Sequence, residues 1–368
     1  MKYLVIFFCL IASLLEINAQ QFPNPIHIPD TLTGPVYNLS VAKSKTPFLD
    51  GDSTPTYGIN GSYLGPTLIM QQDDSVQMNV TNLLGETTTM HWHGMHVAPE
   101  NDGGPHTAIL ADSTWSPAFR VLDEATTFWY HPHLHHKTAE QVYYGAAGII
   151  IVRDEKAVGN QLPHTYGVDE FPLILQDKSF DSNNNLIFAA MADTMMVNGT
   201  LGAYLEVPAQ MVRFHILNAS NQRVYNLGFL AQLQAWQIGS DGGFLENPIS
   251  LNKIQLTPGE RIEIVVNFSQ NQNQSIRFNA FNSELGEGLS GGPSGPRGGP
   301  NNRLDSLDFE VMEFRVVAAT ANAITTPPPS NLNNYNKPLE ANANRHRTKV
   351  FTVDSSGFPF YINGTLMD

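Results

Sequence analysis

The stretch Ser75-Val76-Gln77-Met78-Asn79-Val80 alternates polar and apolar residues with a period of two, which is the pattern of a β-strand with one buried face. Gly148-Ile149-Ile150-Ile151-Val152 is apolar apart from its glycine, and this is typical of a strand buried on both faces. Turn signals separate such stretches: Asp50-Gly51-Asp52, Leu64-Gly65-Pro66 and Asp102-Gly103-Gly104-Pro105. Residues 29–155 are therefore predicted to form a domain of antiparallel strands, either a sandwich or a barrel.

A second strand-rich block is predicted over residues 165–320. Its strands are indicated by the alternating segments Val212–Ile216 and Arg261–Val266. Within this block the Gly/Pro-rich segment 286–300 is interpreted as a mobile surface loop. A linker at 321–348 follows, and residues 349–368 start a new strand pattern. No amphipathic stretch of helical period reaches three turns, so the fold class is expected to be all-β.

Length and net charge limit the classes of function that the chain can have. The chain has 368 residues, which is enough for two or three domains. Its formal net charge of −14 argues against nucleic acid as a partner, because a nucleic-acid binder needs a basic face to neutralise phosphates.

The first 19 residues have the pattern of a secretory signal peptide. Met1-Lys2 precedes the apolar run Tyr3–Leu15, which is too short to span a membrane. An exported protein without a membrane span is therefore expected, periplasmic or extracellular. The single cysteine, Cys9, lies inside this segment, so cleavage after Ala19 would leave no disulfide and no thiolate ligand. A lipoprotein role for Cys9 is less favoured, because no small residues precede it.

Histidines are concentrated in one region. Eight of the 12 fall between residues 91 and 136: His91, His93, His96, His106, His131, His133, His135 and His136. They include two His-x-His pairs, and in a strand residues i and i+2 point to the same face. Each pair would thus direct two imidazoles to one side, a donor set that suits copper, zinc, iron or nickel. His135 is in phase with the second pair, whereas His96, His106 and His136 are expected on the surface.

These residues carry a family resemblance. The chain resembles the multicopper oxidases, and within them the bacterial branch of cuprous oxidases, spore-coat laccases and bilirubin oxidases. The resemblance implies two consecutive cupredoxin-like Greek-key domains and the first strands of a third. Its motifs are His91-Trp92-His93-Gly94, Asp102-Gly103-Gly104-Pro105, Trp129-Tyr130-His131-Pro132-His133, Gln176-Asp177-Lys178, Val197-Asn198-Gly199, Asp241-Gly242-Gly243 and Pro258-Gly259-Glu260-Arg261.

The resemblance also implies roles. His91 would bind the type 2 copper, and His93, His131 and His133 would bind the type 3 pair, in a trinuclear cluster that reduces dioxygen to water. Asp102 matches an acidic residue that handles protons for the bound oxygen species. The alternative for Asp102 is a turn-forming residue before Gly-Gly.

The chain also departs from the family pattern. A third domain normally supplies four more histidines and a type 1 copper site that contains cysteine. Here Phe360-Tyr361-Ile362-Asn363-Gly364 resembles only its opening, and the last histidine is His346. Half of the cluster ligands and the whole type 1 site are therefore expected to be missing from this sequence.

Two functional hypotheses remain open. In the first, the sequence is an incomplete record or a truncated product of a three-domain oxidase, which uses dioxygen and a small reducing substrate such as a phenol, a bilirubin-like pigment or cuprous ion. Alternatively, it is an exported copper-binding or scaffold protein without oxidase activity. A two-domain copper oxidase or a nitrite reductase is disfavoured, since these also need a thiolate. The physiological substrate and the oligomeric state are left open.

Overall fold

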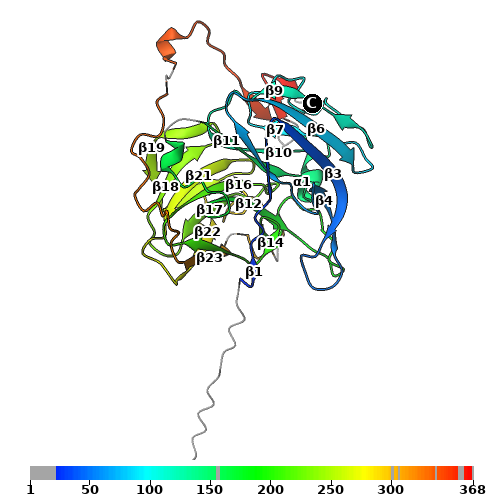
Figure 1. The fold of residues 1–368 in the computed structure, drawn as a ribbon. Helices are drawn as coiled ribbons and strands as arrows, with labels where there is room; N and C mark the ends of the chain where they lie inside the picture. The colour runs from blue at the N-terminus through cyan, green and yellow to red at the C-terminus, as the bar shows by residue number, and fades with distance from the viewer. Residues whose placement is uncertain are drawn as a thin grey trace, which may run out of the picture. The chain divides into compact units, whose positions relative to one another are not determined.

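The computed structural model describes residues 22–154, 158–299, 302–305, 307–335, 338–354 and 360–366. The predicted signal peptide and Cys9 lie outside these residues. Strands dominate the structure (Figure 1), and the all-β prediction is confirmed. Within the described ranges α1 (Thr138–Tyr143) is the only α-helix, and the three 3₁₀ turns are η1 (Gly159–Gln161), η2 (Asn282–Glu284) and η3 (Glu340–Asn342). None of the helices in these ranges is long and apolar enough to cross a membrane.

The first half of the chain forms two five-stranded sheets packed face to face. One sheet has the order β2-β5-β11-β10-β7, and the other has the order β4-β3-β6-β8 with β9 also paired to β6. The strands are β2 (Thr31–Thr33), β3 (Val36–Thr46), β4 (Thr54–Ile59), β5 (Thr67–Gln71), β6 (Ser75–Leu83), β7 (His91–His93), β8 (Thr114–Trp115), β9 (Ala118–Arg120), β10 (Thr126–His131) and β11 (Gly148–Arg153).

The second half forms a larger sandwich. A seven-stranded sheet has the order β14-β13-β12-β16-β21-β18-β19, and a six-stranded sheet has the order β1-β15-β23-β22-β17-β20. The strands are β1 (Asn24–Pro25), β12 (Glu170–Lys178), β13 (Thr194–Val197), β14 (Thr200–Leu201), β15 (Ala203–Pro208), β16 (Met211–Asn218), β17 (Tyr225–Phe229), β18 (Ala235–Ser240), β19 (Gly243–Ser250), β20 (Lys253–Leu256), β21 (Arg261–Asn267), β22 (Ser275–Phe281) and β23 (Asp308–Val317).

Strand periodicity explains how each core is filled. In β6 buried and less buried residues alternate along the strand, as the sequence predicts. β10 is instead buried along its whole length, because both of its faces are covered. Phe128 and Tyr130 point into the core of the first sandwich. Trp129 points the other way, into an apolar cluster that also contains Ile174 and Leu217 of the second sandwich.

This shared cluster joins the two sandwiches. The described residues up to Asn333 form one compact unit, and those from Asn334 form a second. The predicted linker at 321–348 crosses that boundary. Its first part packs against the second sandwich, where Leu332 is buried and its N–H donates to the Glu246 carbonyl over 2.8 Å.

A buried ionic network also crosses between the sandwiches. His215 Nε2 lies 2.8 Å from Glu170 Oε1, and the side chains of both residues are fully buried. Thr127 of β10 donates its hydroxyl to Glu263 Oε1 over 2.8 Å, and Arg213 pairs with Glu263. Arg213 and His215 were part of an alternating strand pattern, and their polar face is not solvated. Instead it is buried against the first sandwich, where each charge has a partner.

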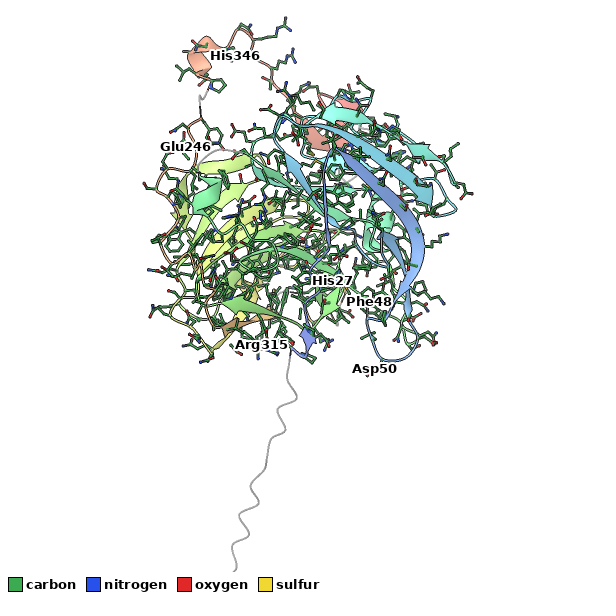
Figure 2. The ribbon with its side chains drawn as sticks, in the orientation of Figure 1. His27, Phe48, Asp50, Glu246, Arg315 and His346 are labelled. Atoms are coloured by element: carbon green, nitrogen blue, oxygen red, sulfur yellow. The ribbon has the colours of Figure 1, made fainter. Side chains whose placement is uncertain are left out.

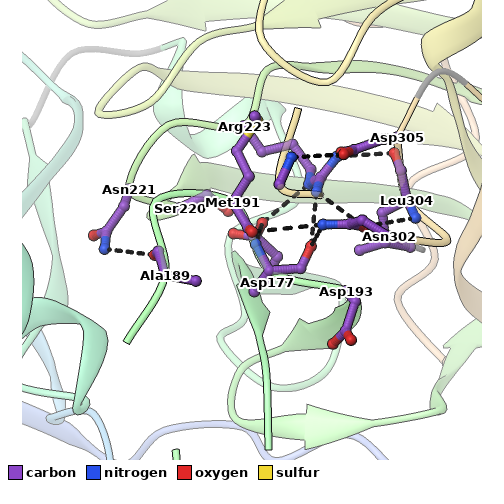
Figure 3. Close-up of polar contacts among 12 residues, drawn as sticks. Asp177, Ala189, Met191, Asp193, Ser220, Asn221, Arg223, Asn302, Leu304 and Asp305 are labelled. Atoms are coloured by element: carbon purple, nitrogen blue, oxygen red, sulfur yellow. Dashed lines mark hydrogen bonds and ion pairs between the residues drawn. The ribbon is translucent and has the colours of Figure 1, made fainter. Parts of the chain in front are cut away.

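The Gly-rich segment at 286–300 is anchored at its end. The guanidinium group of Arg223, which is fully buried, lies between two carboxylates (Figure 3). Its Nε donates to Asp177 of β12 over 3.0 Å, and one of its NH₂ groups donates to Asp305 and to the Leu304 carbonyl, each over 2.8 Å. The residues that follow the loop are therefore held by charge, so the interpretation as a simple solvated loop holds only for its exposed tip.

The second unit contains a three-stranded sheet of β24 (Phe351–Val353), β25 (Phe360–Ile362) and β26 (Thr365–Leu366). Its apolar side chains are largely uncovered, and Phe351 is 72% exposed. His346, which the sequence placed in the linker, is exposed (Figure 2).

The ionic network makes a prediction for stability. Burial alone would raise the pKa of Glu170, but the hydrogen bond from His215 and the charges of Arg153 and Arg213 hold it well below its ordinary value of 4.5. A depressed carboxyl pKa stabilises the fold above about pH 4.5, and this stabilisation is lost as the pH falls toward the folded pKa. Glu170→Gln should lower the free energy of unfolding by about 3–5 kcal/mol at pH 7, because buried arginines lose their partner.

The test is urea unfolding at pH 7 and at pH 4. The variant should lose less stability between the two pH values than the wild type does. Glu206→Gln, at an exposed position of β15, is the control and should stay within about 0.5 kcal/mol of the wild type. Equal stability of Glu170→Gln and wild type at pH 7 would show that the network does not hold the sandwiches together.

Candidate metal centre

The histidine pairs are brought together by strand pairing. β7 pairs antiparallel with β10, with His91 opposite His131 and His93 opposite Trp129. Directly opposed residues of an antiparallel pair point to the same side. The rings of His91, His93, His131 and Trp129 therefore share one face. β10 ends at His131, because Pro132 has no N–H to continue the ladder. The second His-x-His pair is therefore not a strand pair, and the period-two argument for His133 is wrong.

His133 reaches the same place by another route. Its backbone N–H donates to the hydroxyl of Thr89 over 2.5 Å, and Thr89 is fully buried two residues before His91. The ring of His133 lies 5.2 Å from that of His91 and 5.9 Å from that of His131, measured between centroids. The structure thus brings together all four predicted histidines. The sequence carried no signal for Thr89.

Backbone carbonyls orient two of the rings. His91 Nδ1 donates to the carbonyl of Asp102 over 2.9 Å, and His131 Nδ1 lies 2.7 Å from the carbonyl of Pro132. A carbonyl accepts only from a protonated nitrogen, so the opposite nitrogen, Nε2, keeps its lone pair. His131 Nε2 lies 3.1 Å from Nδ1 of His93. Two ring nitrogens from different strands thus face each other across a short gap.

Burial keeps the rings of His93 and His131 neutral. Burial, and then the positive charge of Arg261, lower the pKa of His93 from 6.5 to about 4. Burial lowers the pKa of His131 well below 6.5, although its hydrogen bond to the Pro132 carbonyl opposes this. At neutral pH both rings are therefore unprotonated, which is the state that binds a metal ion.

Asp102 lies against His91. Its Oδ1 is 3.2 Å from His91 Nδ1, within ion-pair distance, but this Oδ1 is buried and has no hydrogen-bond partner. The ring N–H points to the Asp102 carbonyl instead, so the shorter contact is the hydrogen bond. Asp102 is thus both a turn residue, with Gly103 following at φ +70°, and a carboxylate with one oxygen left free beside the cluster.

Two residues of the second sandwich complete the surroundings. Arg261 is buried and donates to the backbone carbonyls of Thr127, Gly259 and Asp241 over 3.0–3.2 Å. Gly259, at φ +83°, approaches the ring of His93 closely enough that a Cβ there would lie 3.7 Å from it. Neither role could be predicted from spacing. In the sequence these two residues stood out only as part of the motif Pro258-Gly259-Glu260-Arg261, to which the family resemblance assigned no role.

The other histidines lie elsewhere. His96 is highly exposed, and its Nδ1 lies 2.6 Å from the buried carboxylate of Asp123. His106, His135 and His136 are exposed, and the rings of His135 and His136 lie against each other at 3.8 Å. His135 does not join the four predicted ligands, because β10 ends at His131 and the alternation of a strand does not continue to residue 135.

The donor set fits copper. Imidazole nitrogen is a good ligand for copper, two of the four rings are neutral, and two have their Nδ1 fixed by a carbonyl. Among the described residues no three His, Cys, Asp or Glu side chains meet at one point as a complete metal site requires.

Comparison with known proteins gives the family. Two family models, both described as multicopper oxidase, match residues 40–157 and 172–291. The crystal structure of the McoA multicopper oxidase from the hyperthermophile Aquifex aeolicus is similar over 93% of this chain and 74% of that chain, with 32% identity and a TM-score of 0.79. The chain belongs to the multicopper oxidase family. Its cupredoxin-like fold class, expected from the resemblance, is confirmed with it.

The relatives of this chain carry two kinds of name. The multicopper oxidase mco of Staphylococcus aureus is 36% identical over 72% of this chain and 61% of its own length. The cell division protein FtsP of Escherichia coli (strain K12) is 35% identical over 71% of this chain and 58% of its own length. The chain thus spans about three fifths of the length of these curated relatives.

The tight turn after Asp102 offers a test of how the site is built. A Cβ on Gly103 would lie 1.6 Å from the carbonyl oxygen of Met90, directly before His91, and Gly103 has a positive φ. Gly103→Ala should therefore destabilise the protein by at least about 1–2 kcal/mol and displace Asp102 from His91.

Gly104→Ala is the matched control, since a Cβ on Gly104 meets nothing within 4 Å. It should leave stability within about 0.5 kcal/mol of the wild type. Chemical denaturation measures both variants, and equal effects at the two glycines would refute this view of the turn.

Proposed function

We propose that His91, His93, His131 and His133 hold part of a copper centre in an oxidase that transfers electrons from a small reducing substrate to dioxygen and forms water. The observation that supports this most is the convergence of four imidazole rings from two strands and a loop, with centroid distances of 5.2–5.9 Å between the contacting pairs. A purely structural role would not require four histidines on one face.

The division of ligands follows the family resemblance. His91 would bind the type 2 copper, and His93, His131 and His133 would bind the type 3 pair. Bound copper would supply the one-electron chemistry that links the reductant to dioxygen. The remaining ligands and the type 1 site would come from a further cupredoxin domain, of which β24, β25 and β26 would be the first strands. Their exposed apolar side chains and the greater length of the relatives support this.

Protein side chains would serve this chemistry in distinct ways. Asp102 Oδ1, unpaired beside His91, would hold a proton and release it as oxygen is reduced. Trp129 stacks on His131 at 3.9 Å between ring centroids and would exclude water from that side. Arg261 would keep the second sandwich against His93 and disfavour protonation of that ring.

Export is part of the same proposal. The signal-peptide pattern at residues 1–19 would direct the chain to the periplasm or outside the cell. The substrate would be a phenol, a pigment or cuprous ion, as in the family branch that the sequence resembles.

A non-catalytic copper-binding or scaffold function is the second candidate. It is favoured by the similarity to proteins named FtsP, which is as high as that to the named oxidases. The absence of three converging donors among the described residues is also compatible with it. The retained histidines oppose a scaffold that binds no metal.

Copper titration of the purified chain tests the proposal. Wild-type protein should take up copper, and His133→Gln should weaken the affinity by at least about tenfold, since one imidazole donor is lost. His135→Gln, two residues away and exposed, is the matched control and should bind like the wild type. No uptake of copper by the wild type would favour the scaffold, and equal loss in both variants would indicate adventitious surface binding.

A further inference from the structure

Two stacked tryptophans lie behind the histidine face of β7, in the core of the first sandwich. Trp92 lies between His91 and His93 in β7, but its side chain points to the opposite face and is fully buried. Its ring is stacked on that of Trp115 in β8, with centroids 6.3 Å apart and an interplanar angle of 11°. Trp115 is half-buried and so reaches solvent.

The neighbouring aromatic residues do not provide an equivalent route. Tyr130 lies 6.4 Å from Trp92, but its hydroxyl donates to the Pro66 carbonyl, which cannot take the proton that a tyrosine loses on oxidation. Trp129 stacks on His131, yet its Nε1 is buried without a partner. Among the described residues its ring contacts only those of His93 and His131. Trp92 Nε1, in contrast, donates to the Asn101 carbonyl over 3.0 Å.

We propose that Trp92 and Trp115 form a one-electron relay that carries oxidising equivalents away from the histidine face to solvent and so protects the ligand histidines. This inference rests on the proposed copper function. Indole is readily oxidised by one electron. The stacked pair places one indole on the strand that carries His91 and His93, on its opposite face, and the other indole at the surface.

Hydrogen peroxide is the oxidant in this relay. Bound copper would supply the one-electron chemistry by which hydrogen peroxide gains one electron and gives hydroxide and a hydroxyl radical. The radical takes one electron from Trp92 and becomes hydroxide, and Trp92 regains an electron from Trp115. The Trp115 cation loses its Nε1 proton to water. A reductant in solution then returns one electron, and water returns the proton, so that Trp115 is restored.

The chain contains its own control. Trp236 on β18 is half-buried like Trp115, and among the described residues no ring contact links it to the histidines. The experiment treats the copper-loaded chain with ascorbate and hydrogen peroxide and maps oxidised tryptophan by peptide mass spectrometry. A zinc-loaded sample is treated in parallel, because zinc has no redox chemistry.

With copper, oxidation of Trp115 should exceed that of Trp236 several-fold, and with zinc the excess should disappear. Trp92→Phe keeps an aromatic ring in the core but should bring Trp115 down to the level of Trp236 and increase ring oxidation of His91 and His93. Trp115→Phe changes only a half-buried position, so it tests the relay without relying on the core variant. It should likewise increase oxidation of the ligand histidines.

Several outcomes would overturn the relay. It is refuted if the zinc-loaded sample shows the same excess at Trp115, or if Trp115 oxidation persists in folded Trp92→Phe protein. Failure of the chain to take up copper refutes both the proposed function and the relay. Copper uptake without preferential oxidation of Trp115 refutes the relay alone.

Discussion

The antiparallel pairing of β7 with β10 is the constraint on which the site depends. Its register puts His91 opposite His131 and His93 opposite Trp129, so that one face of two short strands carries three imidazoles and an indole. A shift by one residue would turn these side chains into the core of the first sandwich and bring Trp92 and Tyr130 to their place. The register is held by burial on both sides, because Trp92 and Tyr130 fill the core of the first sandwich while Trp129 fills the apolar cluster between the two sandwiches.

Burial on both faces has an electrostatic consequence. Polar groups on β10, β12, β16 and β21 are removed from water where the sandwiches meet, and each needs a partner there. Thr127, His215 and Glu263 meet this need across the junction, and Arg213 and Glu170 complete it. The same junction carries Arg261, whose charge disfavours protonation of His93. The packing that joins the sandwiches thereby also keeps the ring of His93 unprotonated at neutral pH.

Much of this could be predicted from the sequence, and the misses have physical causes. Alternation in β6 and the apolar run in β11 identified strands correctly, because one-sided and two-sided burial leave distinct patterns. The four histidines were identified by spacing and resemblance. The position of His133 depends on Thr89, a long-range contact with no local pattern. In the sequence Arg213 and His215 look like a solvated strand face, because alternation does not reveal whether another part of the fold supplies polar partners.

The central claim is that four of the 12 histidines form one copper-binding face. Nuclear magnetic resonance of ring-¹⁵N-labelled protein during titration with Cu²⁺ tests it most directly, because the paramagnetic ion broadens signals of the nearest rings first. The rings of His91, His93, His131 and His133 should lose intensity together at the lowest copper concentrations, while exposed rings such as those of His106 and His135 persist. Earlier loss of the exposed His135 and His136 signals, with the four rings unchanged, would contradict the claim.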